Sequence, residues 1–269
     1  MICAKAVSRP SLALGLFKRL YMTGAGVSMS SIGMADLGLA TQTEMVDTAA
    51  MIANIDPRTP LIADADTGYG TAANVGRTVE RYIAAGCGHL KGKECVSLTE
   101  YLTRIRAAVE ARNRRESDIV IIARTDSLAT HGFDEALRRL KAAVKCGVDA
   151  VFLEAIATNE QLAAYCDAFR GTGVATLYNI VQGSSFGHKI TPRDAEEYGI
   201  GIMIYPALCL LPAYLGITKA LRALKEGKVE DYPHEVGPQL IFQVSGMNGI
   251  QEFDREVSDW VQAFEQDNE

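Results

Sequence analysis

The chain has 269 residues, of which 48% are hydrophobic and 22% charged, a composition typical of a folded protein with a large core. Its formal net charge of −6 and its lack of basic runs argue against a nucleic-acid partner or an anionic membrane surface. The six cysteines follow no paired spacing, which indicates free thiols in a reducing compartment. We therefore expect a cytoplasmic protein without a membrane span, with a mitochondrial location as the alternative.

Short apolar segments alternate with longer amphipathic segments along the chain. The segments that predict strands are 2–6, 19–24, 60–66, 119–125, 150–155, 174–179 and 201–206. The segments that predict helices are 73–85, 98–113, 133–146, 158–169 and 192–198. Strands that are apolar on both faces and separated by helices are typical of a parallel sheet covered by helices.

Seven predicted strands are one fewer than a (β/α)8 barrel needs, and an open doubly wound sheet is the alternative. Polar residues at the ends of most predicted strands favour the barrel, because barrel active sites are built at those ends. The interval between segments 60–66 and 119–125 holds two helical patterns and no strand. We therefore predict one barrel domain over residues 1–269 that lacks a strand immediately before Cys87. Residues from about 235 to 269 predict helices with an apolar stripe, suited to an oligomer contact.

The segment ADADTGYG (63–70) carries two carboxylates at a predicted strand end. Asp64 and Asp66 are two residues apart, so both side chains point to the same face of a strand. Adjacent carboxylates repel each other unless a cation lies between them, and their hard oxygens suit Mg²⁺ or Mn²⁺. Gly68 and Gly70 allow a tight turn beside a ligand. The alternative interpretation is a solvated turn with capping aspartates.

Two further strand ends carry candidate binding groups. In IIARTDS (121–127), Arg124 is suited to bind a substrate carboxylate, or else forms a structural pair with Asp126. In YMTGAGVS (21–28), small residues at a strand end let backbone N–H groups approach an anionic ligand. This glycine-rich loop matches neither a dinucleotide fingerprint nor a phosphate loop.

Cys87 and His89 form the candidate proton shuttle, in the segment CGHLKGKE (87–94). Lys91 and Lys93 favour the thiolate, so the pKa of Cys87 is expected to fall towards neutrality. A thiol near its pKa can exchange a proton with carbon during C–C cleavage. The alternative is a buried, inert cysteine, as we interpret Cys3, Cys146, Cys166 and Cys209.

Four ordered motifs, YMTGAGVS with IGMADLGLAT, DADTGYG, CGHLKGKE and IIARTD, resemble the isocitrate lyase and phosphoenolpyruvate mutase superfamily. The resemblance spans nearly the whole chain and is closer to the lyase branch. It implies an (α/β)8 barrel, a homotetramer that exchanges its last helices, bound Mg²⁺ and a mobile lid carrying the CGH motif. It also implies cleavage of C–C bonds in 2-oxo or 2-hydroxy dicarboxylates.

The resemblance also implies a role for individual residues. Asp64 and Asp66 would hold Mg²⁺, directly or through water, with Asp36 close to the metal and substrate. Cys87 would be the acid or base, and His89 would lie beside it. The implied substrate contacts are Thr23, Gly24, Ala25, Asp36, Gly88, Arg124, Glu154 and Asn179.

The chain departs from the family pattern at the root of the lid. The family has a strand reading roughly AGLHIEDQ and then a lysine before the cysteine, whereas YIAAG joins CGHL directly here. A barrel strand, an acidic residue of the metal shell and the lid lysine are thereby lost. YPALCLLPAY (205–214) lacks the arginine typical of methylisocitrate lyases, which brings the chain closer to fungal-type oxaloacetate hydrolases and dimethylmalate lyases.

Two functions therefore stay open. One is a Mg²⁺-dependent C–C lyase or hydrolase for a small dicarboxylate of the oxaloacetate, dimethylmalate or methylisocitrate type. The other is a catalytically impaired homologue, or the product of an incomplete gene model, that keeps a binding or oligomeric role. A barrel without one strand must close with seven strands, reuse a loop in its place or expose two edges, and each option is expected to cost stability and to misplace Cys87.

Overall fold

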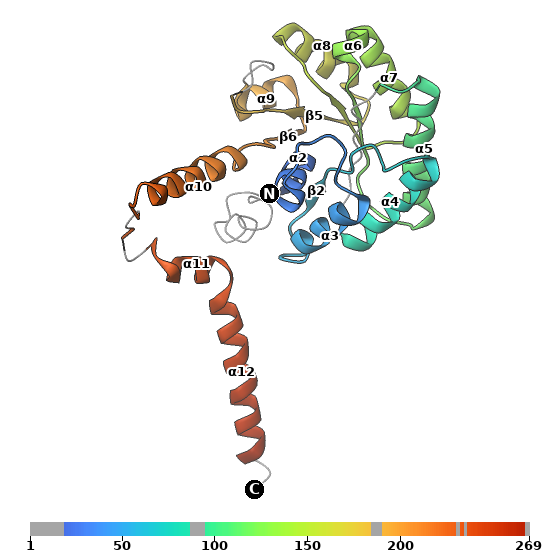
Figure 1. Ribbon diagram of the computed structural model, residues 1–269. Coiled ribbons are helices and arrows are strands. Elements are labelled where there is room, and N and C mark those ends of the chain that lie inside the picture. Colours follow the sequence, from blue (N-terminus) through green and yellow to red (C-terminus); the bar gives the residue numbers. More distant parts are fainter. Residues whose placement is uncertain (1–18, 87–94, 184–189, 230–231, 234–235, 267–269) are drawn as a thin grey trace.

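The computed structural model describes residues 19–86, 95–183, 190–229, 232–233 and 236–266. In these residues, parallel strands are covered by helices (Figure 1). The strands are β1 (Leu20–Met22), β2 (Leu61–Ala63), β3 (Ile122–Thr125), β4 (Ala150–Leu153), β5 (Ala175–Asn179) and β6 (Ile202–Ile204). The helices are α2 (Gly24–Val27), the π-helix η2 (Ser28–Ile32), α3 (Gln42–Ala53), α4 (Ala72–Ala85), α5 (Leu98–Arg114), α6 (Leu128–His131), α7 (Phe133–Lys145), α8 (Asn159–Phe169), α9 (Pro192–Tyr198), α10 (Leu210–Lys225), α11 (Pro238–Val244) and α12 (Met247–Gln266).

The strands form two separate parallel sheets. β1 pairs with β2, and β3, β4, β5 and β6 pair in that order. In the part of the chain that the structure describes, no strand lies between β2 and β3, and these two strands are not paired with each other. The barrel wall is therefore open where the sequence predicts a missing strand. The predicted strand 2–6 lies outside the described residues.

The predicted strands and helices agree with the described part of the structure except at their ends and in five helices that the prediction omitted. The predicted strand 150–155 continues past β4, but Ala155 has a φ of 65° and turns the backbone out of the sheet. The prediction omitted α3, although Thr41 and Glu44 form a capping box at its start. The prediction also omitted the short α2, η2 and α6 and the long α10.

Two hydrophobic clusters lie on opposite faces of the strands. The larger one joins the strands to the covering helices and includes Leu140, Val151, Leu153 and Tyr165. The smaller one contains Ile122, Ala150, Phe152, Leu177 and Ile204, and Tyr21 and Ile62 of the other sheet pack against it. Since side chains alternate between the two faces of a strand, the smaller cluster marks the interior of the barrel. Both sheets therefore contribute to one interior although no described strand joins them.

Helices α4 and α5 pack against each other on the outside of the opening. α4 is capped after its last residue by Gly86, which has a φ of 83° and lies with Ile83 and Leu61 near the start of β2. α5 ends beside the start of β4, where Arg112 Nη2 donates to the carbonyl of Gly147 over 3.0 Å. Both helices therefore run towards the starts of the strands.

The last helices lead away from the barrel. α10, α11 and α12 form an arm that projects beyond the strands, with α12 furthest from them (Figure 1). None of the three has a buried residue. Within the described residues, no helix is both long enough and apolar enough to cross a membrane.

Candidate active site

Polar residues follow the ends of β1 to β5. Thr23 comes directly after β1, Asp64 after β2, Asp126 after β3 and Glu154 after β4, while Asn179 ends β5. Because these strands are parallel, their carboxyl ends meet at one end of the barrel. The structure therefore gathers most of the predicted site residues in one place.

Arg124 is the centre of this cluster. Its Nη2 lies 2.6 Å from Asp126 Oδ1, and its Nε lies 3.0 Å from the same oxygen. Nη2 is also 2.9 Å from Glu154 Oε2, although that contact lacks the alignment of a hydrogen bond. The Arg124 side chain is only 9% exposed. Burial lowers the pKa of Arg124, but Glu154 and Asp126 outweigh it, so the pKa lies above its ordinary value and the guanidinium stays charged.

Asn179 extends the cluster to the next strand. Its Nδ2 lies 3.5 Å from Glu154 Oε1, which is a long hydrogen bond. Its Oδ1 is buried and has no hydrogen-bond partner in the described part of the chain. A buried acceptor without a partner is costly, so this atom is suited to a ligand or a water molecule.

Asp64 is held by the backbone around it. Its side chain is buried, its Oδ2 accepts from the backbone N–H of Gly24 over 3.3 Å, and its Oδ1 accepts from that of Asp66 over 2.9 Å. A methyl group built on Gly24 would lie 2.9 Å from Asp64 Oδ2, so only glycine allows this approach. Tyr82 of α4 donates to the Asp64 carbonyl over 2.9 Å, which fixes the end of β2.

Backbone conformations that side chains rarely adopt gather beside the cluster. Asp66, Tyr69 and Ala155 have φ values of 48°, 63° and 65°, and each lies just after β2 or β4. Such residues cost about 1–3 kcal/mol each and persist where the surrounding structure holds them. They are common at active sites, in agreement with the clustered carboxylates.

Two aromatic residues of the site escaped the sequence analysis. Phe152 lies opposite Arg124 in the register of β3 and β4, and the guanidinium stacks over its ring at 4.8 Å. Tyr21 lies in the interior, where burial, followed by the charge of Asp64, raises the pKa of its phenol. Each aromatic residue stands two positions before a predicted site residue, Glu154 or Thr23. The two-residue alternation of strands was the signal that could have found them.

The remaining predicted residues lie at the edge of the cluster or outside the described residues. Ala25 is in the short α2, and Asp36 follows η2, close enough to be a minor cause of the raised pKa of Tyr21. Cys87, Gly88 and His89 lie outside the described residues. Their proposed role in proton transfer stays a prediction.

The described residues contain no group of three or more histidine, cysteine, aspartate or glutamate side chains arranged to hold a metal ion. Mg²⁺, however, keeps several water ligands and is often bound by only one or two carboxylates. Asp64 and Asp66 offer such a pair, because their carboxylates stand two residues apart directly after β2 and supply hard oxygen donors. The donor set therefore fits a water-rich Mg²⁺ site and not a closed protein cage.

Known proteins resemble this chain over most of its length. Residues 2–225 match the family model described as phosphoenolpyruvate phosphomutase. The chain is 38% identical over 223 residues to 2,3-dimethylmalate lyase of Eubacterium barkeri, covering 78% of this chain and 75% of that protein.

Solved structures give the same family. Oxaloacetate acetylhydrolase in complex with the product oxalate is 41% identical, with a TM-score of 0.88 over 93% of this chain and 89% of that chain. Phosphonopyruvate hydrolase in complex with oxalate and Mg²⁺ is 25% identical, with a TM-score of 0.78 over 93% and 90%. The resemblance drawn from the four motifs and the predicted barrel fold are both confirmed. The chain belongs to the phosphoenolpyruvate mutase and isocitrate lyase superfamily, and it stands among that superfamily's lyases.

Proposed function

We propose that the protein is a Mg²⁺-dependent lyase or hydrolase that cleaves a C–C bond in a small 2-oxo or 2-hydroxy dicarboxylate. Candidate substrates are oxaloacetate, 2,3-dimethylmalate and 2-methylisocitrate. The observation that carries the proposal is the convergence of Arg124, Glu154, Asn179 and Asp64 at the carboxyl ends of the strands. The relatives, named for 2,3-dimethylmalate and oxaloacetate, support it.

Substrate binding is assigned to Arg124 and Asn179. Hydrogen bonds to Asp126 use Nε and Nη2 of Arg124, and no bond to Nη1 is found among the described residues. Nη1 can therefore donate to a substrate carboxylate while the structural pair stays intact. The buried Oδ1 of Asn179 can accept from a substrate hydroxyl, and the amide in its other orientation donates to a carboxylate.

Charge balance supports a cation at this site. Arg124 supplies one positive charge, whereas Asp64, Asp126 and Glu154 supply three negative charges around it. A dicarboxylate would add two more negative charges to a partly buried volume, which is unfavourable without a counter-ion. Asp64 and Asp66 would hold Mg²⁺, directly or through water. A bound Mg²⁺ stabilises the negative charge that develops on the substrate oxygen during bond cleavage.

A second candidate function is binding without turnover. Gly86, the residue before Cys87, lines a cavity with Leu61 and Ile62, the first residues of β2, whereas Asp64 follows the last. Each residue of a strand advances the chain by about 3.3 Å, so Gly86 lies near the end of the strands opposite to the carboxylates. That position favours an impaired homologue that still binds Mg²⁺ and a dicarboxylate.

The two candidates are separated by measuring turnover and binding on the same preparation. Each substrate is incubated with Mg²⁺ or with a chelator, and product is quantified, oxalate in the case of oxaloacetate. Thermal unfolding in the presence of Mg²⁺ and oxalate reports binding. A ligand whose free concentration is a hundred times its Kd raises the free energy of unfolding by about 2.7 kcal/mol. Turnover that the chelator abolishes supports the enzyme. A ligand-dependent shift of the unfolding temperature without turnover supports the second candidate. The absence of both turnover and a thermal shift would contradict both candidates.

Three variants assign the roles. Asp64→Asn should remove the Mg²⁺-dependent shift, because it removes one carboxylate of the pair. Cys87→Ser should abolish turnover if Cys87 is the acid or base, while retained turnover would exclude it. Cys209→Ser is the matched control, because Cys209 lies at the start of α10, outside the cluster.

We also propose that the arm mediates a homo-oligomer, in the form of a tetramer. Along α12, Ile250, Phe253, Val257, Trp260 and Phe264 recur at helical spacing, and all are exposed in the single chain. A stripe of this kind is stable in water when another apolar surface covers it. Light scattering during size-exclusion chromatography should give a tetramer for the native chain and a smaller species for Phe253→Asp. A monomeric native chain at all concentrations would contradict the proposal.

A further inference from the structure

Helix α4 presents a polar stripe to the loop that follows β2. The stripe consists of Asn74, Thr78 and Tyr82, which are four residues apart and therefore share one face of the helix. The loop comprises residues 64–71 and carries both carboxylates assigned to Mg²⁺, so we call it the carboxylate loop. Asn74 Oδ1 accepts from the backbone N–H of Thr71 over 3.1 Å. The first side chain of the stripe thus holds the end of the loop.

The other two side chains of the stripe hold the start and the middle of the loop. Tyr82 donates to the carbonyl of Asp64 over 2.9 Å, and the Thr78 hydroxyl donates to the carbonyl of Gly68 over 3.1 Å. Asp66 stands between these two anchored carbonyls, two residues from each. Its carboxylate therefore keeps a fixed place beside that of Asp64 only while both anchors hold.

The carboxylate loop needs external anchors because its backbone is strained. Asp66 and Tyr69 have φ values of 48° and 63°, in the left-handed region that side chains rarely adopt. Such a backbone persists where the surrounding structure holds it. Gly68 lies between these two residues in the sequence, so the bond from Thr78 acts on the strained part of the loop.

Thr78 has one hydroxyl proton and two carbonyls within reach. The carbonyl of Asn74, one turn earlier in α4, lies at 2.8 Å, and this bond is common for a threonine in a helix. The carbonyl of Gly68 is the second acceptor. Thr78 is fully buried, so water does not take the place of either bond. The same hydroxyl therefore joins the helix to the loop.

Gln42 of α3 orients that hydroxyl. Its Nε2 donates to Thr78 Oγ1, which turns the hydroxyl proton towards the two carbonyls. Arg81 Nη1 donates to Gln42 Oε1 over 3.0 Å, and because a guanidinium only donates, this bond fixes which end of the amide faces Thr78. The anchor at Gly68 is thus supported by a second helix.

We propose that Thr78 is a positioning residue of the metal site. By holding the carbonyl of Gly68, it keeps the carboxylate of Asp66 beside that of Asp64. Mg²⁺ requires near-ideal ligand geometry, so a loosened loop costs metal affinity. The inference rests on the proposed function, because that function assigns Mg²⁺ to these two carboxylates.

Thr78→Val tests the proposal, because it replaces the hydroxyl by a methyl group of similar size. Mn²⁺ serves as the probe, and electron paramagnetic resonance measures the free ion. The Kd for Mn²⁺ should rise about tenfold or more in Thr78→Val and stay within about twofold of the native value in Thr78→Ser, which keeps a hydroxyl. Thr103→Val is the matched control, since Thr103 bonds to the carbonyl four residues earlier on the exposed side of α5.

Amide exchange in the metal-free protein gives a measurement that needs no cation. The N–H groups of Asp66 and Gly68 are hydrogen-bonded within the carboxylate loop. They should exchange with deuterium faster in Thr78→Val than in the native chain, whereas the amides of α5 should not change. If Thr78→Val does not fold, Gln42→Met is used for both measurements, because it removes the amide that orients the hydroxyl. Its Kd for Mn²⁺ should rise about threefold.

The two measurements separate this inference from the proposed function. A lower unfolding free energy of Thr78→Val with unchanged Mn²⁺ affinity would make Thr78 a structural residue only, and it would overturn the proposal. Unchanged exchange of the loop amides would overturn it as well. A native chain that binds no Mn²⁺ would contradict the proposed metal site. The exchange rates would then decide by themselves whether Thr78 holds the loop.

Discussion

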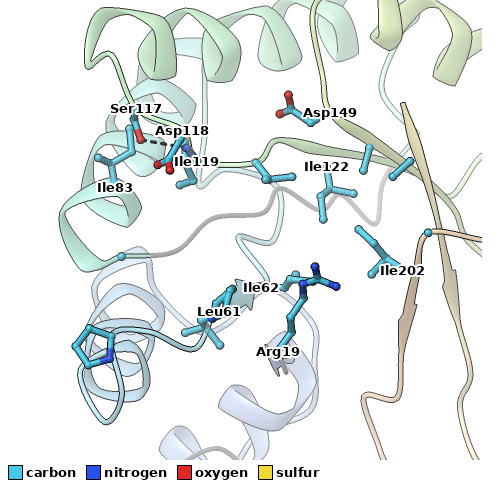
Figure 2. A pocket seen from close by; sticks show the side chains of 17 residues that line it. Arg19, Leu61, Ile62, Ile83, Ser117, Asp118, Ile119, Ile122, Asp149 and Ile202 are labelled. Carbon is cyan, nitrogen blue, oxygen red and sulfur yellow. Dashed lines mark hydrogen bonds between the residues drawn. The ribbon is translucent and has the colours of Figure 1, made fainter. Parts of the chain in front are cut away.

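At one end of the strands the side chains are charged and already hold one another, while at the other end they are aliphatic and border a cavity. Both ends belong to the same barrel, and among the described residues no strand joins β2 to β3 at either end. The polar end keeps its arrangement because each of its contacts joins residues of the same sheet. Gly24 and Asp64 follow β1 and β2, while Arg124, Glu154 and Asn179 belong to or follow β3, β4 and β5. At the apolar end no described strand lies between β2 and β3, and a cavity borders their first residues (Figure 2). A lost strand therefore damages packing before it damages a site assembled from many strand ends.

The strongest test of this contrast is Arg124→Ala at the polar end. The variant leaves Asp126 and Glu154 partly buried without their shared cation, so we expect a loss of about 3 kcal/mol of unfolding free energy. Arg170→Ala is the control, because the Arg170–Asp167 pair is more than 60% exposed on both sides and should cost under about 1 kcal/mol. Urea denaturation measures both values. Equal losses would show that the cluster contributes no more than a surface pair.

The same substitution at each end sharpens the comparison. In Gly24→Ala, the new methyl group meets Asp64 Oδ2 at 2.9 Å, so we expect a loss of about 2 kcal/mol. In Gly201→Ala, the methyl group meets the Ala175 side chain at 3.1 Å beside the cavity, where space is available for relaxation. The second variant should lose less than about 1 kcal/mol. The reverse order would mean that the cavity end is the more rigid.

Tyr82→Phe probes the support of the polar end. It removes a buried hydroxyl that donates to the Asp64 carbonyl over 2.9 Å, and we expect a cost of about 1 kcal/mol. Tyr205→Phe is the control, since its hydroxyl reaches only the sulfur of Met203 at 3.9 Å. The unfolding midpoint in denaturant should separate the two variants. A silent Tyr82→Phe would show that the end of β2 is held by other contacts.

The smallest expected effect concerns alkaline pH. Burial, followed by Asp64, raises the pKa of Tyr21 in the folded state, so its ionisation opposes folding. The associated stability is complete below the ordinary tyrosine pKa of about 10 and is lost as the pH rises above it. Tyr21→Phe should flatten this alkaline decline of the unfolding free energy, whereas Tyr214→Phe, with a side chain 62% exposed, should not. An unchanged decline in Tyr21→Phe would assign the effect to other tyrosines.

The fold was predictable because its signals are local. Strands such as AVFL (150–153) are apolar on every residue, and helix starts carry capping residues such as Thr158 at the start of α8. The polar strand ends followed from the same periodicity. The interruption was also readable, because an interval with two helices and no strand breaks the alternation.

Other features depend on contacts that sequence cannot supply. Arg124 reaches Glu154 because β3 and β4 pair with Arg124 opposite Phe152, and that register is a property of the assembled sheet. The left-handed backbone at Asp66 and Ala155 is set by the turns that follow the strands and not by residue type. The cavity has no local signal either, since its lining comes from the starts of β2 to β6.

The separation into two sheets also bears on how the molecule unfolds. A closed barrel links every strand to two neighbours, whereas β1 and β2 form a two-stranded pair that is marginal by itself. The pair depends on interior contacts of Tyr21 and Ile62 with the four-stranded sheet. Such a unit can open before the rest of the molecule, so a single all-or-none transition is not expected. Amides of β1 and β2 should therefore exchange with deuterium through an opening of lower free energy than the amides of β4 and β5. We expect the open barrel to unfold as two cooperative units, one for each sheet.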